Sequence, residues 1–406
     1  MLKQDITRPI ARAPRHWHFV YAFIALLAIY LSNGRTFGQI DSLPASLLPV
    51  ALLVDGSITY DGIIEGLDRG KVPSGFRQTD RGLVSLFPVA TGLLALPFYA
   101  PVIALKALVS TPSLQGWVHF SWDFQKVPAA VFAALAVLAF WRLCEAAEFP
   151  LSLSLGLTLW LAFGSELFAI GAQALWQHGP GTLAVIATMD AQLRLRHQSN
   201  VRGALALSAF SALAVAIRPS NLLIAGPFGL LALKQNPRLW LPLLTPAAAL
   251  LALQLAYNLH FFGAILGNYA WVPSAVAPGN LVHGLLGLLF SPGRGLLVYF
   301  SIAGLSAAAL AIRPRTLADP TAAVAGLGVV AATLLSASYY VWWGGWSYGP
   351  RFLSEIEPAI LLLLGFARRG MSEGLRRGFL VALFALLPYG GSSASSPSIW
   401  VAPPRM

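Results

Sequence analysis

The chain has 406 residues, of which 57% are hydrophobic and 11% are charged. Soluble domains carry about a quarter charged residues, so this composition excludes an ordinary soluble protein. The formal net charge of +11 fits a membrane protein with Lys- and Arg-rich cytoplasmic loops, and it requires no nucleic-acid partner. The single cysteine, Cys144, excludes an intramolecular disulfide. No CxxC or HExxH motif indicates a metal cofactor, although a divalent metal stays possible.

The first apolar run extends from about Phe19 to Leu31 and follows a basic N-terminal stretch. No small-residue cleavage site comes after it, so we expect an uncleaved span with its N-terminal tail in the cytoplasm. Further runs of nearly 20 apolar residues recur along the chain, and the alternation typical of barrel strands is absent. The sequence therefore predicts an all-α polytopic membrane protein.

The run from Leu83 to Val109 decides the predicted topology. Pro88, Pro97 and Pro101 interrupt it, and because proline disrupts helix interiors we expect a bent or re-entrant element that does not cross the membrane. If it crossed, the later basic loops would face outward, against the positive-inside rule. About 11 spans (10–13) are predicted near 17–32, 126–143, 151–169, 179–195, 203–217, 221–234, 239–258, 296–312, 321–341, 358–368 and 378–391.

These spans predict one transmembrane module at 1–391, with a long first external loop at 33–125 that bears surface helices. Residues 392–406 are predicted to form a flexible external tail, since they are rich in Ser and Pro. The unusual polar segments all fall on the external side. They are 33–41, 165–179, 218–221, 258–294 and 342–358. The span interiors hold almost no ionisable residues, unlike those of ion-coupled transporters.

Asp41 is the first candidate for chemistry, because it follows the first span closely within the stretch NGRTFGQIDSLP. A carboxylate at the membrane interface is partly desolvated, which favours the role of a general base. The alternative is a solvated loop acid or a helix N-cap, and Ser42 begins a plausible helix start. Asp123 and Glu355 are the secondary acid candidates.

The segment SELFAIGAQALWQHG, at 165–179, places Trp176, Gln177 and His178 just before a Gly-Pro-Gly. One interpretation is a sugar-binding surface, in which the indole stacks on the sugar while the amide and imidazole bind hydroxyls. The other is a turn in the aromatic belt of the membrane interface. Trp346 and Tyr348 are further candidates for sugar or acceptor contact.

Basic residues beside Gly and Pro in the expected external loops are candidate phosphate ligands, because guanidinium groups bind phosphate oxygens in pairs. The strongest is Arg351, in the segment WWGGWSYGPRFLSEIEP. Arg294 lies in SPGRG, Arg218 in RPSN, and Arg35 in the first loop. Two alternatives stay open: Arg218 extends to the membrane interface without a phosphate partner, or Arg351 pairs internally with Glu355.

The ordered set of these motifs resembles bacterial membrane glycosyltransferases of the GT-C superfamily. The motifs run in order NGRTFGQIDSLPASLLP, SLFPVATGLLALPFYAP, AQALWQHGPG, IRPSN, LFSPGRGLLVY and WWGGWSYGPRFL. The resemblance implies that Asp41 is the catalytic carboxylate and that Arg218, Arg294 and Arg351 hold a lipid phosphate. The chain departs at Ser46, where relatives often carry an Arg after Asp-Thr-x-Pro-Ala.

The expected function is that of an integral-membrane inverting glycosyltransferase. It would move a hexose or pentose from a polyprenyl-phosphate donor to an extracytoplasmic lipid, glycan or protein, as generic mannosyltransferase-like proteins do. The expected location is the bacterial inner membrane, with the active site on the extracytoplasmic side. Membrane lipids are expected partners. The rivals are a flippase for lipid-linked sugars and a non-catalytic assembly subunit. The sequence leaves the oligomeric state open.

Overall fold

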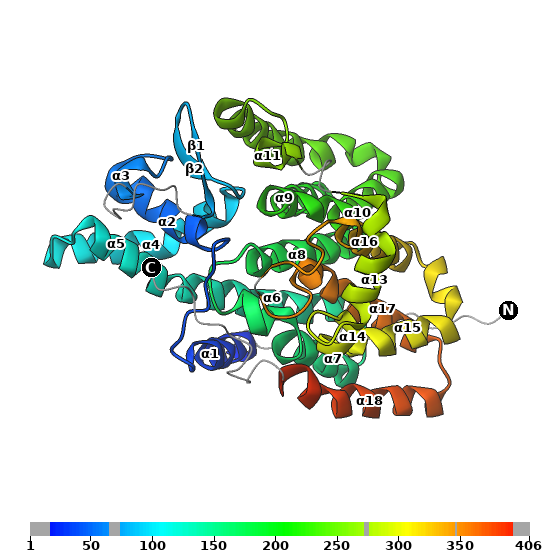
Figure 1. Ribbon diagram of the computed structural model, residues 1–406. Helices are drawn as coiled ribbons and strands as arrows, with labels where there is room; N and C mark the ends of the chain where they lie inside the picture. Colours follow the sequence, from blue (N-terminus) through cyan, green and yellow to red (C-terminus); the bar gives the residue numbers. More distant parts are fainter. Residues whose placement is uncertain (1–16, 65–73, 272–275, 346, 393–406) are drawn as a thin grey trace.

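The computed structural model describes residues 17–64, 74–271, 276–345 and 347–392 (Figure 1). The N-terminal tail expected in the cytoplasm lies outside these ranges. So does the expected flexible tail, except for Ser392, which ends the last helix.

Helices make up the main body, and most residues of every range predicted to span are helical. The helix is interrupted at 164–165 within 151–169 and at 300–301 within 296–312, and it ends at Ser338 within 321–341. The helices of this body are α1 (Trp17–Leu31), α6 (Lys126–Ala146), α7 (Leu151–Phe163), α8 (His178–His197), α9 (Val201–Ile217), α10 (Leu222–Gln235), α11 (Trp240–Phe262), α14 (Leu296–Tyr299), α15 (Ile302–Ile312), α16 (Pro320–Ser338), α17 (Glu357–Arg369) and α18 (Glu373–Ser392). Their apolar side chains form one large core that includes Phe140, Trp160 and Phe228. The Trp160 indole N–H donates to the Leu383 carbonyl at 2.6 Å and fastens α7 to α18.

Four helical stretches of the described residues are long and apolar enough to cross a bilayer: Ala90–Val109, Leu114–Ala146, Pro237–Phe262 and Pro320–Ser338. Six shorter apolar helices accompany them, α1 and α7 included. The helices of α11 and α16 expose rows of large apolar side chains, such as Leu253 and Leu327, as membrane-facing helices do. The number of helices that cross the bilayer stays a prediction.

The expected first external loop has its own structure. Its elements are α2 (Leu43–Val50), a π-helical turn (Ala51–Asp55), α3 (Asp61–Ile64), β1 (Phe76–Thr79), β2 (Gly82–Ser85), α4 (Ala90–Val109) and α5 (Leu114–Phe124). In Figure 1, α2, α3 and the strands gather at the left, beyond the ends of α8 and α9. A separate core that contains Tyr60, Tyr99 and Trp117 holds them together.

Two features of this loop differ from the predictions. The run from Leu83 to Val109 was expected to be bent or re-entrant, and it does not turn back on itself, because α4 is one continuous helix of 20 residues with Pro97 and Pro101 inside it. That this helix does not cross the membrane stays a prediction. Residues 76–85 form an antiparallel hairpin, with Phe76 opposite Ser85 and Thr79 opposite Gly82, where only surface helices were expected.

Two further segments expected outside lie against one another. The stretch after α11 forms short turns at Gly267–Trp271 and Pro278–Asn280 and then α13 (Leu281–Phe290). A single β-bridge joins Val276 to Tyr339, at the start of the loop that carries Arg351. That loop ends in a 3₁₀ turn, η9 (Arg351–Ile356), directly before α17. The bridge therefore connects two of the predicted polar segments.

Candidate active site

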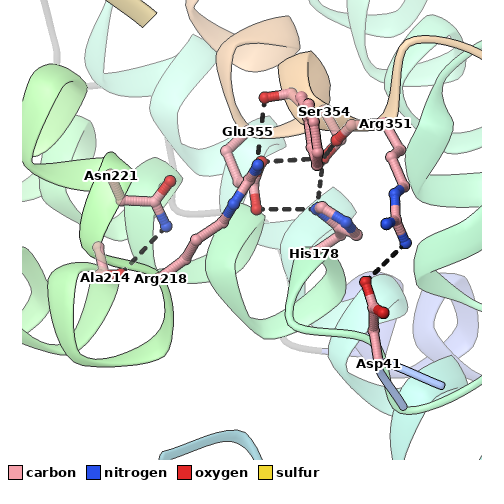
Figure 2. A network of polar contacts seen from close by, with 9 residues as sticks. Asp41, His178, Ala214, Arg218, Asn221, Arg351, Ser354 and Glu355 are labelled. Carbon is pink, nitrogen blue, oxygen red and sulfur yellow. Dashed lines mark hydrogen bonds and ion pairs between the residues drawn. The ribbon is translucent and has the colours of Figure 1, made fainter. Parts of the chain in front are cut away.

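The centre of the site is an ion pair between Asp41 and Arg351. The Arg351 Nη1 lies 2.7 Å from the Asp41 Oδ2, with side chains 11% and 26% exposed respectively (Figure 2). Asp41 comes from the loop after α1, and Arg351 begins η9. The sequence nominated both residues, and the fold brings them into contact.

Aromatic rings surround the Arg351 guanidinium. Its central carbon lies 5.3 Å from the ring centre of Trp176 and 5.5 Å from that of Phe352. Cation–π contacts of this length fix the plane of a guanidinium group. Trp176 is itself held, because its indole N–H donates to the Phe37 carbonyl at 3.1 Å. The Trp176 ring therefore links the loop that precedes Asp41 to the loop that carries Arg351.

Glycines give the Arg351 loop its path. Gly344 and Gly345 both have φ of +73°, and Gly349 has φ of +51°, in the left-handed region that glycine adopts most easily. Gly349 also has no room for a side chain, because a Cβ there would overlap the carboxylate of Glu166. The glycine-rich composition of this segment thus serves its backbone conformation.

A second polar network lies beside the first, on the side of α9 and α8 (Figure 2). The Arg218 Nη1 donates to the Glu355 Oε2 at 2.6 Å. The other carboxylate oxygen, Oε1, lies 3.0 Å from the His178 Nδ1. The Ser354 hydroxyl donates to Glu355 at 2.9 Å and lies 2.9 Å from the His178 Nδ1. Burial raises the pKa of Glu355, but Arg218 and His178 outweigh burial and lower it to about 2. Glu355 is therefore ionised at neutral pH.

These contacts settle two alternatives. The ion pair suggested between Arg351 and Glu355 is wrong, since Arg351 pairs with Asp41 and Glu355 pairs with Arg218. Asp41 does not cap a helix either. Ser42 precedes α2, and the Asp41 carboxylate points to Arg351 instead.

A second guanidinium group lies close to Arg351. Arg294 donates from Nη2 to the Gly345 carbonyl at 2.8 Å, in the Arg351 loop. Burial lowers the pKa of Arg294 and Arg351 adds to that effect, whereas Tyr299 and Glu166 oppose it. Arg294 and Arg351 lie here beside two carboxylates, those of Asp41 and Glu166. Burial raises the pKa of Glu166 well above its ordinary value and so favours its uncharged form, which leaves an excess of positive charge suited to an anion.

Sequence reasoning passed over two residues that support this site. Lys126, only 5% exposed, donates from Nζ to the Asn33 side chain at 2.6 Å, the Arg35 carbonyl at 2.7 Å and the Gln173 side chain at 2.8 Å. The lysine therefore fastens the start of the Asp41 loop to the segment before Trp176. Glu166, 2% exposed, has a side-chain oxygen without a hydrogen bond among the described residues.

The other candidate residues differ in how far they are buried. Gln177 and Tyr348 are buried, and Tyr348 packs edge-on against Tyr299 at 4.8 Å. Arg35 and Asp123 are exposed, and their side chains take no part in the two networks of Figure 2. Trp346 lies outside the described residues. Within the described ranges, no three His, Cys, Asp or Glu side chains come together as a metal-binding group.

No protein-family model and no curated protein sequence matches the chain. Two crystal structures of ArnT from Cupriavidus metallidurans do match. The apo structure has a TM-score of 0.54 and 15% identity, over 90% of this chain and 62% of ArnT. The structure bound to undecaprenyl phosphate has a TM-score of 0.52 and 14% identity, over 92% of this chain and 64% of ArnT.

The chain has the fold of ArnT. It spans less than two thirds of the length of ArnT. The polytopic helical membrane architecture expected from the GT-C resemblance is therefore confirmed. At this level of identity the comparison establishes the fold alone, and the chemistry must be argued from the site.

Proposed function

We propose that the protein is an inverting glycosyltransferase that takes a sugar from a polyprenyl-phosphate donor at the external face of a bacterial inner membrane. The observation that carries this proposal is the contact between Asp41 and Arg351, at 2.7 Å. It joins the best candidate base to a cation suited to a phosphate, within a fold that ArnT shares.

The proposed reaction needs one base and one anion site. The acceptor hydroxyl attacks the anomeric carbon of the sugar, and Asp41 takes the hydroxyl proton. The new carbon–oxygen bond forms as the bond from that carbon to the phosphate oxygen breaks, and the polyprenyl phosphate leaves with the electron pair. Attack from the face opposite the phosphate inverts the anomeric centre.

Arg351 and Arg294 would bind the phosphate and stabilise the charge that grows on it. A donor phosphate at Arg351 must compete with Asp41 for the same guanidinium group. Donor binding would therefore release the Asp41 carboxylate from its cation, which makes it a stronger base once the donor is in place. Arg218 serves a different role in this proposal, because Glu355 already binds it at 2.6 Å.

The donor class is supported by one of the two similar structures, since that ArnT structure holds undecaprenyl phosphate. The transferred sugar could be a hexose or a pentose. His178, Gln177 and Trp176 are proposed to contact it. His178 begins α8 and lies near Asp41 and Arg351 in Figure 2, and the Trp176 ring lies 5.3 Å from the Arg351 guanidinium. Gln177 lies between these two residues in the chain.

The test is sugar transfer by purified full-length protein supplied with polyprenyl-phosphate sugars and membrane lipid extract. Asp41→Asn should lower the turnover rate by about 10²- to 10⁴-fold, the usual range for a general base. Asp55→Asn is the matched control, because Asp55 is an exposed acid of the same loop. Near-normal turnover by Asp41→Asn would overturn the proposal.

A further inference from the structure

Glu166 is a buried acid that the proposed reaction does not use. It follows α7, directly before the π-helical turn η3 (Leu167–Gly171), and only 2% of it is exposed. Its carboxyl oxygen Oε2 is buried and has no hydrogen-bond partner among the described residues. The ion pairs of those residues do not include Glu166 either. An ionised carboxylate is costly in such a place, because no donor and no ion-pair partner compensates for the lost water.

A second buried acid, Glu357, lies directly against Glu166. Glu357 is 1% exposed and begins α17. The backbone N–H of Glu166 donates to the Glu357 oxygens, to Oε2 at 3.1 Å and to Oε1 at 3.4 Å. The start of a helix also favours a negative charge. Of the two acids, Glu357 is therefore the one suited to carry the charge, and Glu166 is the one suited to hold a proton.

The electrostatic balance of this pair supports the same assignment. Two carboxylates so close together repel one another when both ionise, so one proton stays on the pair. Burial raises the pKa of Glu166 well above its ordinary value, and Arg294 and Arg351 only partly oppose this rise. Burial also raises the pKa of Glu357, whereas the hydrogen bond from the Glu166 N–H acts in the opposite direction.

Glu166 also supports the path of the loop that carries Arg351. Its carboxyl group occupies the space where a side chain at Gly349 would lie, two residues before Arg351. The chain is packed on both sides of this contact, because Ile170 lies in one buried cluster with Tyr348. The acid therefore touches the backbone of the loop and forms no ion pair with the guanidinium group.

The other charged groups around Glu166 decide what its charge would affect. The titratable side chains on the segments that pack around it are those of Lys126, His178, Arg294, Tyr299, Arg351, Glu355 and Glu357. Lys126 is bound by three oxygen atoms of its own, and His178 lies on Glu355. Arg294 and Arg351 are therefore the cations that would respond to a charge on Glu166.

The uncharged form of Glu166 leaves Arg351 with donors for a ligand. Arg351 pairs with Asp41 through Nη1, and its Nε is buried without an acceptor among the described residues. An ionised Glu166 would add a negative charge within electrostatic reach of Arg351 and Arg294. That charge would compete with any anion that binds the two guanidinium groups.

We propose that Glu166 is a positioning residue that acts as an uncharged acid. It supports the Arg351 loop at Gly349, and the proton that it holds keeps Arg294 and Arg351 available for the phosphate of the donor. Loss of this proton weakens donor binding at alkaline pH. The inference rests on the proposed glycosyl transfer and adds to it the charge state on which donor binding depends.

The first test detects the proton itself and needs no donor. Infrared spectra of the full-length protein in detergent at about pH 7 should contain the carbonyl band of a buried, protonated carboxyl group. Glu166→Gln should lose this band. Glu148→Gln, at an exposed glutamate before α7, should keep it. A wild-type spectrum without the band, or a band that Glu166→Gln retains, would overturn the inference.

The second test is undecaprenyl phosphate binding between about pH 6 and about pH 9, the range in which a buried glutamate can titrate. The wild type should lose about tenfold in affinity relative to Glu166→Gln over this range, because the glutamine has no proton to lose. The comparison of the two curves cancels the titration of the phosphate itself. Glu166→Ala removes the support of Gly349 and should bind about fivefold more weakly than Glu166→Gln at about pH 6. Glu148→Gln should follow the wild type.

The outcomes separate this inference from the proposed function. Parallel pH curves for the wild type and Glu166→Gln, or equally weak binding by Glu166→Gln and Glu166→Ala, would overturn the inference and leave the proposed function standing. A wild-type protein that bound no undecaprenyl phosphate at any pH would overturn the proposed function. The infrared band would then still decide whether Glu166 holds the proton.

Discussion

The carboxylate of Asp41 lies 2.7 Å from the guanidinium group of Arg351, although the two residues come from opposite parts of the chain. The pair is partly buried, which makes it stronger than an ion pair in water. In the proposed function, a polyprenyl phosphate that binds Arg351 replaces the carboxylate. This exchange makes the base available only when the leaving group is in place, and the predictions below follow from it.

The planar shape of Arg351 is the first feature to test. Arg351→Lys keeps the positive charge but loses both the paired donors and the stacking on Trp176. We expect the turnover rate to fall by about 10²-fold, the effect of removing one charge-stabilising donor. Turnover measured beside Arg315→Lys, an exposed residue of the expected cytoplasmic side, gives the control. An active Arg351→Lys enzyme would show that the fork of the guanidinium group is not used.

Lys126 is predicted to position Asp41 from a distance. Lys126→Met removes one donor from each of three oxygen acceptors and loosens the start of the Asp41 loop, where Asn33 still donates to the Gln173 side chain at 2.9 Å. A shift of about 1 Å in a catalytic group can cost roughly 10²-fold in rate, so kcat should fall by tenfold to a hundredfold. The affinity for undecaprenyl phosphate should change little, because Lys126 does not touch Arg351.

The comparison for Lys126 is Lys234→Met, which removes an exposed lysine at the end of α10. A fall in kcat with an unchanged donor affinity marks a positioning role. A loss of donor affinity equal to the loss of kcat would contradict it and would indicate general unfolding of the site.

Because of Glu355, the folded protein should become less stable as the pH falls. Its pKa is about 2 in the folded state, below the ordinary value of 4.5. A lowered folded pKa stabilises the protein above the unfolded pKa, and that stability is lost as the pH falls from about 4.5 toward 2. The whole contribution is of the order of 3 kcal/mol.

Thermal unfolding in detergent between pH 6 and pH 3 measures this effect. The wild type should lose Tm as the pH falls, and Glu355→Gln should lose less because it has no carboxylate to protonate. Glu373→Gln, at an exposed residue of α18, should follow the wild-type curve. Identical pH profiles for the wild type and Glu355→Gln would exclude Glu355 as the source.

Local patterns in the sequence were sufficient to predict the helices of the bundle. Apolar runs of helical length depend on composition alone, and each predicted range is mostly helical, from α1 (Trp17–Leu31) to α18 (Glu373–Ser392). Proline was a weaker guide. Pro97 and Pro101 suggested a bent or re-entrant element because each lacks an N–H group, yet α4 continues as one helix through both.

The partners within the site could not be predicted, because they are set by contacts between distant segments. Arg351 had a carboxylate four residues away at Glu355, and the fold gives that acid to Arg218 instead. From the sequence, Lys126 was interpreted only as a cation at the start of a predicted span. Its role depends on Asn33 and Gln173, which only the folded chain brings near it.

The most direct test is the affinity of Asp41→Asn for undecaprenyl phosphate, measured together with its turnover. Removal of the carboxylate frees Arg351, so the variant should bind the phosphate about tenfold more tightly than the wild type while its turnover collapses. Affinity and rate must therefore move in opposite directions. Weaker or unchanged phosphate binding by Asp41→Asn would contradict the account, because Asp41 and the donor phosphate would then not share Arg351.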